Sequence, residues 1–144
     1  MNISFVDMQS QYFTIKEEID AGIQRVLDHG QFILGPEVSE FETELANYVG
    51  VQHVVSCASG TDALTLALME EGVGPGDAVF VPSFTFTATA EVVLLLGATP
   101  VFVDVDSENF TIDCESLREA IESINLEGKL RARVVIPVDL FGLP

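Results

Sequence analysis

The sequence has few basic residues: six lysines and arginines stand against 23 aspartates and glutamates, which gives a formal charge of −17. This balance argues against nucleic acid or an anionic membrane surface as a partner. The longest apolar run, residues 92–96, is too short to span a bilayer, and the N-terminus shows no signal peptide. With only Cys57 and Cys114, the chain predicts reduced thiols in a cytoplasmic protein rather than a disulfide framework.

No repeat, linker or low-complexity tract interrupts the 144 residues, of which 48% are apolar, so disorder is not expected. A capping box at Thr14 and Glu17 predicts a first helix that ends at Gly30, and Pro36 begins a second one that ends at Gly50. Four strands are predicted to alternate with helices over 63–69, 87–96 and 115–124; the strands cover residues 53–56, 78–81, 100–104 and 133–138.

This alternation predicts an α/β fold with a largely parallel sheet and crossover helices, preceded by two helices. Residues 1–50 form the helical segment in this prediction, and residues 51–144 form the four β units. Nine apolar positions are expected in the core: Val54, Leu64, Leu68, Val79, Val81, Val101, Val103, Val135 and Ile136.

A small-residue turn, Ser59-Gly60-Thr61, stands between the first predicted strand and the helix after it. Such a turn aims free backbone N–H groups and the positive end of a helix dipole at one point, where a phosphate is the natural guest. Gly60 permits close backbone approach, and Thr61 adds a hydroxyl donor. The alternative interpretation is a strand-to-helix turn with a good N-cap.

Ligands of open α/β sheets bind at the carboxyl ends of the strands. The turn at Ser59, the loop with Phe84 and Phe86, and the segments at Asp104 and Asp139 all follow strands on that edge. A phosphate turn beside an aromatic loop predicts a flat, phosphorylated ligand. For one of the two phenylalanines core packing remains the alternative, because alternate residues of an extended loop face opposite ways.

Three other functions stay open. Asp104 and Asp106 match the nucleophile pattern of a haloacid-dehalogenase-type phosphatase, and with Glu108 and Glu115 they mimic an EF-hand loop. The phosphatase motif wants Thr or Val at Glu108, and the calcium loop wants Gly at Asn109. A non-catalytic phosphate- or nucleotide-binding module is the third reading, and the absence of Gly-x-Gly-x-x-Gly counts against it.

Six short motifs follow one another along the chain: Phe5-Val6-Asp7-Met8-Gln9-Ser10-Gln11-Tyr12, Gly35-Pro36-Glu37-Val38, Ser59-Gly60-Thr61-Asp62-Ala63-Leu64, Gly74-Pro75-Gly76-Asp77, Pro82-Ser83-Phe84-Thr85-Phe86-Thr87-Ala88-Thr89-Ala90 and Pro100-Val101-Phe102-Val103-Asp104-Val105-Asp106. In their order and spacing, these motifs together resemble the N-terminal part of DegT/DnrJ/EryC1/StrS-family aminotransferases. The resemblance implies the large domain of fold type I pyridoxal-phosphate enzymes, which aminate keto groups of nucleotide-linked sugars. Residues 26–36 are similar to the branch that makes UDP-linked 3-amino-hexuronic acids.

The resemblance also assigns roles. Ser59, Gly60 and Thr61 would bind the phosphate of pyridoxal 5'-phosphate, and Phe86 would stack on its ring. The sugar nucleotide would lie near Phe32, Gly35 and Asp139, although relatives commonly carry His at the last position. The family further implies an amino donor, with glutamate expected, and a homodimer.

The chain lacks two groups that this chemistry requires: the Schiff-base lysine and the acid that pairs with the pyridine nitrogen. Its only lysines, Lys16 and Lys129, are expected to be solvated surface charges. The sequence therefore predicts a fragment that does not transaminate alone. In the family strand order 3-2-4-5-6-7-1, strands two, three and four would be neighbours and strand one, residues 53–56, would lack partners.

Overall fold

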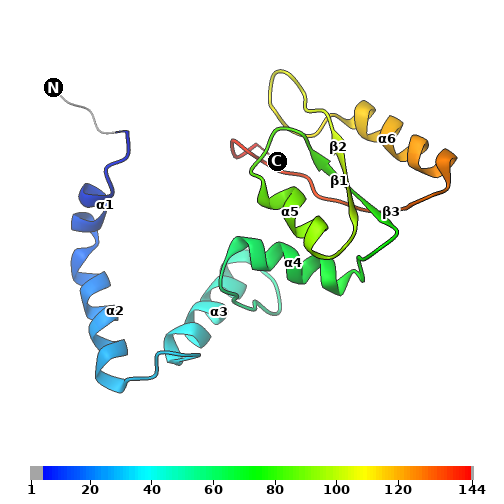
Figure 1. Ribbon diagram of the computed structural model, residues 1–144. Helices are drawn as coiled ribbons and strands as arrows, with labels where there is room; N and C mark the ends of the chain where they lie inside the picture. The colour runs from blue at the N-terminus through cyan, green and yellow to red at the C-terminus, as the bar shows by residue number, and fades with distance from the viewer. Residues whose placement is uncertain (1–4, 144) are drawn as a thin grey trace. The chain divides into compact units, whose positions relative to one another are not determined.

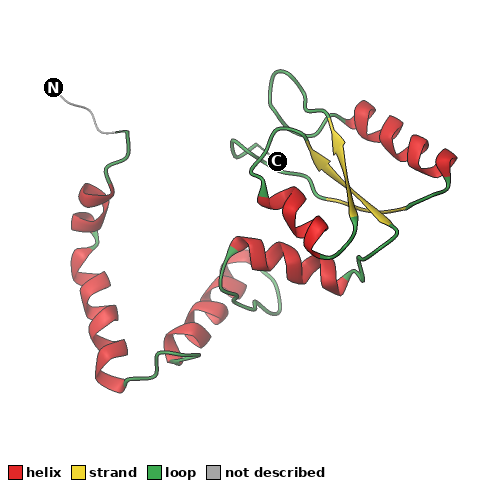
Figure 2. Cartoon of the chain, viewed as in Figure 1, coloured by secondary structure: helices red, strands yellow, loops and turns green. Residues whose placement is uncertain are grey.

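The computed structural model describes residues 5–143 and consists of two compact units, divided between Ser56 and Cys57. Among the described residues, the first unit contains helices α1 (Met8–Thr14), α2 (Lys16–His29) and α3 (Pro36–Val49). The second alternates helices and strands in the order α4 (Gly60–Glu70), β1 (Asp77–Pro82), α5 (Ala88–Leu95), β2 (Thr99–Val103), α6 (Cys114–Glu127) and β3 (Arg131–Val135) (Figures 1 and 2). Between residues 5 and 143, no helix is long and apolar enough to cross a membrane.

The first helical segment starts earlier than predicted. Asp7 is the N-cap of α1, and its carboxylate accepts a hydrogen bond from the Ser10 N–H at 3.0 Å. The predicted capping box is wrong: the Thr14 hydroxyl donates to the Ser10 carbonyl at 3.0 Å, and Ile15 occupies the N-cap of α2 without a side-chain bond. Because Asp7 already caps the chain, Thr14 falls inside the helical region.

The strand predicted over residues 53–56 is not formed. Among the described residues, no strand pairs with residues 53–56, and an extended segment without a hydrogen-bonded neighbour does not count as a strand of a sheet. Instead, the Val51 N–H donates to the Ala46 carbonyl at 3.0 Å, and the Ser56 N–H donates to Glu42 Oε1 at 2.8 Å. Val54 is consequently only half-buried rather than part of a core.

The second unit contains a parallel sheet in the order β2-β1-β3. This order confirms that the strands predicted at 78–81, 100–104 and 133–138 are neighbours. All six residues of the central strand β1 are buried. In the register, Phe80 lies opposite Val101 of β2 and Val135 of β3.

Helices cover both faces of this sheet (Figure 1). Val79 and Val81 of β1 pack with residues of α4 and α5, among them Leu68, Val92 and Val93. Ala78 and Phe80 point the other way and pack with Val103 and α6, which contributes Leu117, Ile121 and Ile124. The period-two alternation of a strand thus divides one apolar run between two core clusters.

Most of the predicted core is confirmed. Five of the nine residues are buried: Leu68, Val79, Val81, Val103 and Ile136. Leu64 and Val101 are partly buried and pack against the clusters. The prediction that Val135 belongs to the core is wrong, because this residue is 36% exposed. A bulge shifts the register of β3 near Ala78, so that Val134 lies opposite Val79 and packs against the α4/α5 cluster instead.

Asp77 is a buried carboxylate that joins β1 to β3. It accepts hydrogen bonds from Arg131 Nε at 2.8 Å and from the Gly74 N–H at 3.0 Å. The Arg131 bond lowers the pKa of Asp77, and the Gly74 bond lowers it further against the opposing effect of burial. A lowered folded-state pKa means that this carboxylate stabilises the fold above its unfolded pKa, about 3.9, and that the contribution disappears as pH falls through the folded pKa.

We therefore expect Asp77→Asn to unfold at lower urea concentration than wild type at pH 7. The asparagine NH₂ group replaces one of the two accepting oxygens, so it would face another donor, either Arg131 or the Gly74 N–H. The difference should begin to shrink below about pH 4, where the carboxyl of the unfolded chain protonates, and should be smallest below the lowered pKa of Asp77 in the folded protein. Urea midpoints measured across this range test the effect, with Asp28→Asn on the surface of α2 as the control. A gap between the two proteins that widens in acid would contradict the assignment.

Candidate functional site

A cleft of about 640 Å³ lies at the carboxyl edge of the sheet in the second unit. The starts of α4 and α5, the loop after β1 and the segment after β3 form its walls. Its lining consists of Gly60, Thr61, Leu64, Thr85, Phe86, Ala88, Thr89, Ile136, Pro137, Val138, Asp139 and Leu140. Its volume falls in the range of small-molecule sites in proteins, and its position matches the general location of ligands on open α/β sheets.

The start of α4 contributes hydrogen-bond donors to this cleft. Ser59 is the N-cap: its hydroxyl oxygen accepts from the Asp62 N–H at 3.1 Å and lies 3.0 Å from Asp62 Oδ2. The N–H groups of Gly60 and Thr61, in the first turn, have no intrahelical carbonyl to bind, and the positive end of the helix dipole adds to them. A Cβ added at Gly60 would meet no atom within 4 Å, so the backbone faces open space.

The two phenylalanines of the loop after β1 lie in different surroundings. Phe86 lines the cleft with 74% of its surface exposed. Phe84 is half-exposed and contacts Phe110 with ring centroids 5.7 Å apart, and Phe110 in turn contacts Phe141 at 5.4 Å. The core-packing alternative is therefore wrong for both rings, and of the two only Phe86 is among the described lining residues of the cleft.

Among the lining residues that the sequence interpretation did not assign to the site, two carry hydroxyl groups, Thr85 and Thr89. Thr89 is buried and lies in the first turn of α5, where its N–H donates to the Phe86 carbonyl at 3.2 Å. A second helix N-terminus therefore adjoins the same cleft, and it adds positive potential for an anion. The signal was the alternation of Thr85, Thr87 and Thr89 around the start of a helix.

Asp139 lines the cleft, whereas Phe32 and Gly35, the other residues assigned to the sugar nucleotide, belong to the first unit. Ser59 is not among the described lining residues; its side chain caps α4. The structure thus brings together Gly60, Thr61 and Phe86 with Asp139.

The carboxylates of the phosphatase and calcium alternatives are occupied by local turns. Asp106 Oδ1 accepts from the backbone N–H groups of Asn109 at 3.0 Å and Glu108 at 2.9 Å, and these bonds lower the Asp106 pKa. Asp104 Oδ1 accepts from the Val105 N–H at 2.8 Å. Within residues 5–143, no three His, Cys, Asp or Glu side chains are grouped as metal ligands would be.

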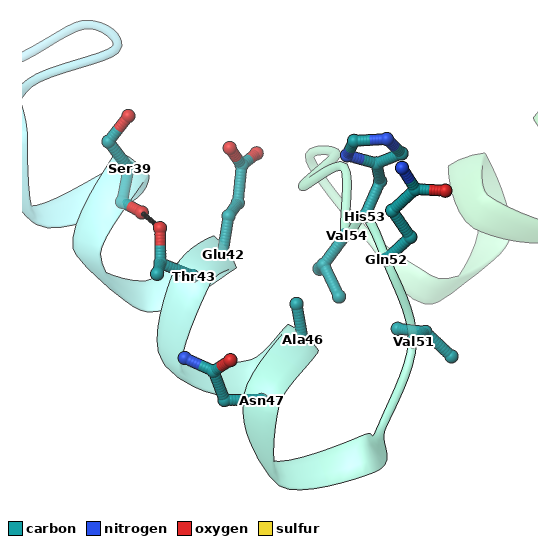
Figure 3. Close-up of a pocket in the computed structure, with 9 residues that line it drawn as sticks. All are labelled: Ser39, Glu42, Thr43, Ala46, Asn47, Val51, Gln52, His53 and Val54. Atoms are coloured by element: carbon teal, nitrogen blue, oxygen red, sulfur yellow. Dashed lines mark hydrogen bonds between the residues drawn. The ribbon is translucent and has the colours of Figure 1, made fainter.

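A second hollow, of about 270 Å³, lies within the first unit between α3 and residues 51–54 (Figure 3). Polar side chains dominate its lining, including Glu42, Asn47 and His53. Glu42 is engaged by Ser56, whose hydroxyl donates to Glu42 Oε1 at 2.7 Å. This hollow adjoins the side of α3 and residues 51–54, not the N-terminus of a helix, so among the described residues no helix dipole points its positive end into it as α4 does in the second unit.

Comparison with known proteins gives the family. Residues 13–144 match the model of the DegT/DnrJ/EryC1/StrS aminotransferase family. The chain belongs to this family. One relative, from Pseudomonas aeruginosa, bears the name UDP-2-acetamido-2-deoxy-3-oxo-D-glucuronate aminotransferase. It is 52% identical over 140 residues, which cover 97% of this chain and 37% of the relative.

Solved structures of other proteins share the fold of this chain. An aminotransferase of this family from Brucella abortus is 53% identical, with a TM-score of 0.96 over 99% of this chain and 38% of the other. NtdA from Bacillus subtilis, solved with bound cofactor PMP, is 30% identical with a TM-score of 0.79 over 99% of this chain and 32% of the other. The α/β fold predicted from the sequence is confirmed, and the chain spans less than two-fifths of the length of these relatives.

Proposed function

We propose that this chain supplies the phosphate- and ring-binding part of a pyridoxal-phosphate-dependent aminotransferase that acts on a keto group of a nucleotide-linked sugar. The observation that carries the proposal is the cleft in which the free N-terminus of α4, at Gly60 and Thr61, adjoins the exposed ring of Phe86. Family membership and the PMP bound by NtdA support the same cofactor, because PMP is the aminated form of pyridoxal phosphate.

The residues present fit this cofactor. Its phosphate would accept hydrogen bonds from the N–H groups of Gly60 and Thr61 and from the Thr61 hydroxyl, while Ser59 holds the turn as N-cap. Phe86 would pack flat on the ring and exclude water from one of its faces. When bound, the cofactor supplies an aldehyde that carries the amino group and a ring that accepts electrons.

For the substrate we propose a UDP-linked 3-keto hexuronic acid, with glutamate as amino donor. The name of the Pseudomonas aeruginosa relative and the similarity of residues 26–36 to that branch support this choice. Phe32, Gly35 and Asp139 are the proposed contacts to the sugar nucleotide. We further propose a homodimer, in keeping with exposed apolar side chains on α2 and α3 such as Ile23, Leu27 and Phe41, and a cytoplasmic location, in keeping with two free cysteines.

Neither lysine of the chain is among the described residues that line the cleft. Lys16 donates to Asp20 and to the Tyr12 hydroxyl, and these bonds, the Asp20 one first, raise its pKa and keep its amine protonated. Lys129 is exposed, lies 3.4 Å from Glu127, and precedes β3. It is therefore on the amino edge of the sheet, about 16 Å along the strand from the cleft edge. The amino-transfer lysine of this proposal comes from outside the 144 residues.

A chimera tests the proposal. This chain replaces the matching segment of the Pseudomonas aeruginosa relative, whose remaining sequence is kept. We expect the chimera to bind pyridoxal phosphate, seen as visible absorbance, and to aminate the relative's UDP-linked 3-oxo sugar with glutamate. The unmodified relative is the positive control. A folded chimera that neither binds the cofactor nor aminates the sugar would sink the proposal.

The 144-residue chain alone provides the paired measurement. Mixed with pyridoxal phosphate and reduced with borohydride, it should retain no stoichiometric label on either lysine and transfer no amino group from glutamate, because Lys16 is paired with Asp20 and Lys129 is solvent-exposed beside Glu127. Peptide mass mapping locates any label. Full labelling of Lys129 together with amino transfer would show that the chain is a complete catalyst, contrary to this proposal.

A further inference from the structure

The loop between α2 and α3, residues 30–35, is closed by one histidine at its base. His29, the last residue of α2, contacts the Glu37 carboxylate through Nε2, at 3.0 Å from Oε2 and 3.2 Å from Oε1. Its other ring nitrogen, Nδ1, accepts a hydrogen bond from the Gln31 N–H at 3.0 Å. A single side chain therefore binds both the first residues of the loop and the first turn of α3.

These contacts define the tautomer of His29. Because Nδ1 accepts from a backbone N–H, it carries no proton, and the proton of the neutral ring is on Nε2, where it is donated to Glu37. The Glu37 carboxyl is held ionised as an acceptor: its own backbone N–H and then the His29 ring lower its pKa, with Arg25 adding a smaller effect.

The backbone of the loop is also tightly folded on itself. A Cβ at Gly35 would lie 2.4 Å from the Gln31 carbonyl oxygen, so only glycine fits there. Leu34 has φ of 49°, in the left-handed region that non-glycine residues seldom adopt. Despite this constraint the loop buries none of its large side chains: Phe32, Ile33 and Leu34 are 70%, 87% and 83% exposed.

The backbone of residues 30–35 is constrained, and it presents three apolar side chains to solvent. This arrangement suits contact with a bound molecule. We propose that His29, as its Nε2-protonated tautomer, is a positioning residue that fixes the loop at residues 30–35 for the sugar nucleotide. This inference rests on the proposed function, in which Phe32 and Gly35 contact that substrate. His29 acts through the Gln31 amide and Glu37 and does not touch the substrate itself.

Two conservative variants separate the two bonds of His29. Asparagine can place an acceptor near the position of Nδ1 but is too short to reach Glu37, whereas glutamine can place a donor near Nε2 but has no acceptor for the Gln31 N–H. Alanine removes both. Gln24→Ala is the matched control, since Gln24 is also on α2 and its side chain donates to Asp28 of the same helix.

The first measurement uses the 144-residue chain and needs no substrate. Long-range ¹H–¹⁵N spectra should show His29 protonated at Nε2 and bare at Nδ1. Amide exchange at Gln31 should accelerate about two- to tenfold in His29→Ala and His29→Gln, and remain near wild type in His29→Asn and Gln24→Ala. Equal exchange in wild type and His29→Ala, or a proton on Nδ1, would overturn the inference.

The second measurement uses the chimera with the UDP-linked 3-oxo sugar of the Pseudomonas aeruginosa relative. His29→Ala should raise KM for the sugar about three- to tenfold and leave kcat within about twofold, because the loop must then be ordered on binding. His29→Asn and His29→Gln should fall between wild type and His29→Ala. If the chimera is active and His29→Ala leaves its KM for the sugar unchanged, this inference alone is overturned. If the chimera with wild-type His29 is inactive, the proposed function is overturned, and the substrate role of His29 with it.

Discussion

Replacing Phe80 with alanine is expected to destabilise the sheet unit by about 3–5 kcal/mol. Phe80 is 1% exposed on the central strand, and it packs between Val103 of β2 and the apolar face of α6. Removing the ring both loses its burial and leaves a cavity that the flanking strands cannot fill, since β1 is fixed by ladders on both sides. Urea unfolding followed by circular dichroism gives the change in midpoint and slope.

Phe102 provides the control. It is the same residue type on the neighbouring strand β2, but it is 62% exposed, so Phe102→Ala should change the stability by less than about 1 kcal/mol. Phe80→Leu, which retains part of the buried volume, should fall between wild type and Phe80→Ala. Loss of the cooperative transition in Phe80→Ala has the same meaning as a large shift. Equal midpoints for Phe80→Ala and Phe102→Ala would contradict the two-cluster description of the core.

Cofactor affinity in the chimera should fall about tenfold or more when the Thr61 hydroxyl is removed. A hydrogen bond to a charged phosphate is worth about 1.5–3 kcal/mol, which corresponds to this loss. Phe86→Ala should weaken binding as well, because the ring loses its stacking surface. Titration of each apo-chimera with pyridoxal phosphate, followed by absorbance, gives the dissociation constants.

Gly60→Ala makes the sharper test of the phosphate position. The added Cβ meets no protein atom within 4 Å, so the variant should fold at least as stably as wild type while placing a methyl group against the bound phosphate. We expect an unchanged or higher melting temperature together with weaker cofactor binding. If Gly60→Ala left the affinity for the cofactor unchanged, the proposal that the phosphate binds at the start of α4 would be wrong.

Matched controls exist for each of these changes. Thr65→Ala removes a hydroxyl from the same helix that donates back to the Thr61 carbonyl, Phe84→Ala removes the ring that contacts Phe110, and Gly22→Ala adds a methyl group within α2. All three side-chain positions lie outside the cleft lining, so the dissociation constant should stay at the wild-type value. Wild-type affinity in Thr61→Ala and Phe86→Ala as well would show that the cofactor assignment is wrong.

Local patterns in the sequence determined much of the second unit. Runs such as 78–81 predicted buried strands, the spacing of Leu117, Ile121 and Ile124 predicted the face of α6 that packs on the sheet, and glycines ended α2 and α3 in the left-handed conformation. The turn at Ser59 predicted a capped helix start. These features depend on contacts within one turn or one strand period, which the order of residues encodes directly.

Only the tertiary structure decided the features that need a distant partner. The sequence already predicted that residues 53–56 would lack strand partners, but only the structure shows that no strand forms there among the described residues and that Glu42 binds Ser56 instead. A bulge in β3 placed Val134, and not Val135, opposite Val79. The hydrogen bond between His29 and Glu37 joins residues on either side of a loop. Phe86 lines the cleft, whereas Phe84 is not among its described lining residues. Strand pairing and the packing of side chains depend on residues that are distant in the sequence. Local sequence patterns do not determine which of these distant residues become neighbours in the fold.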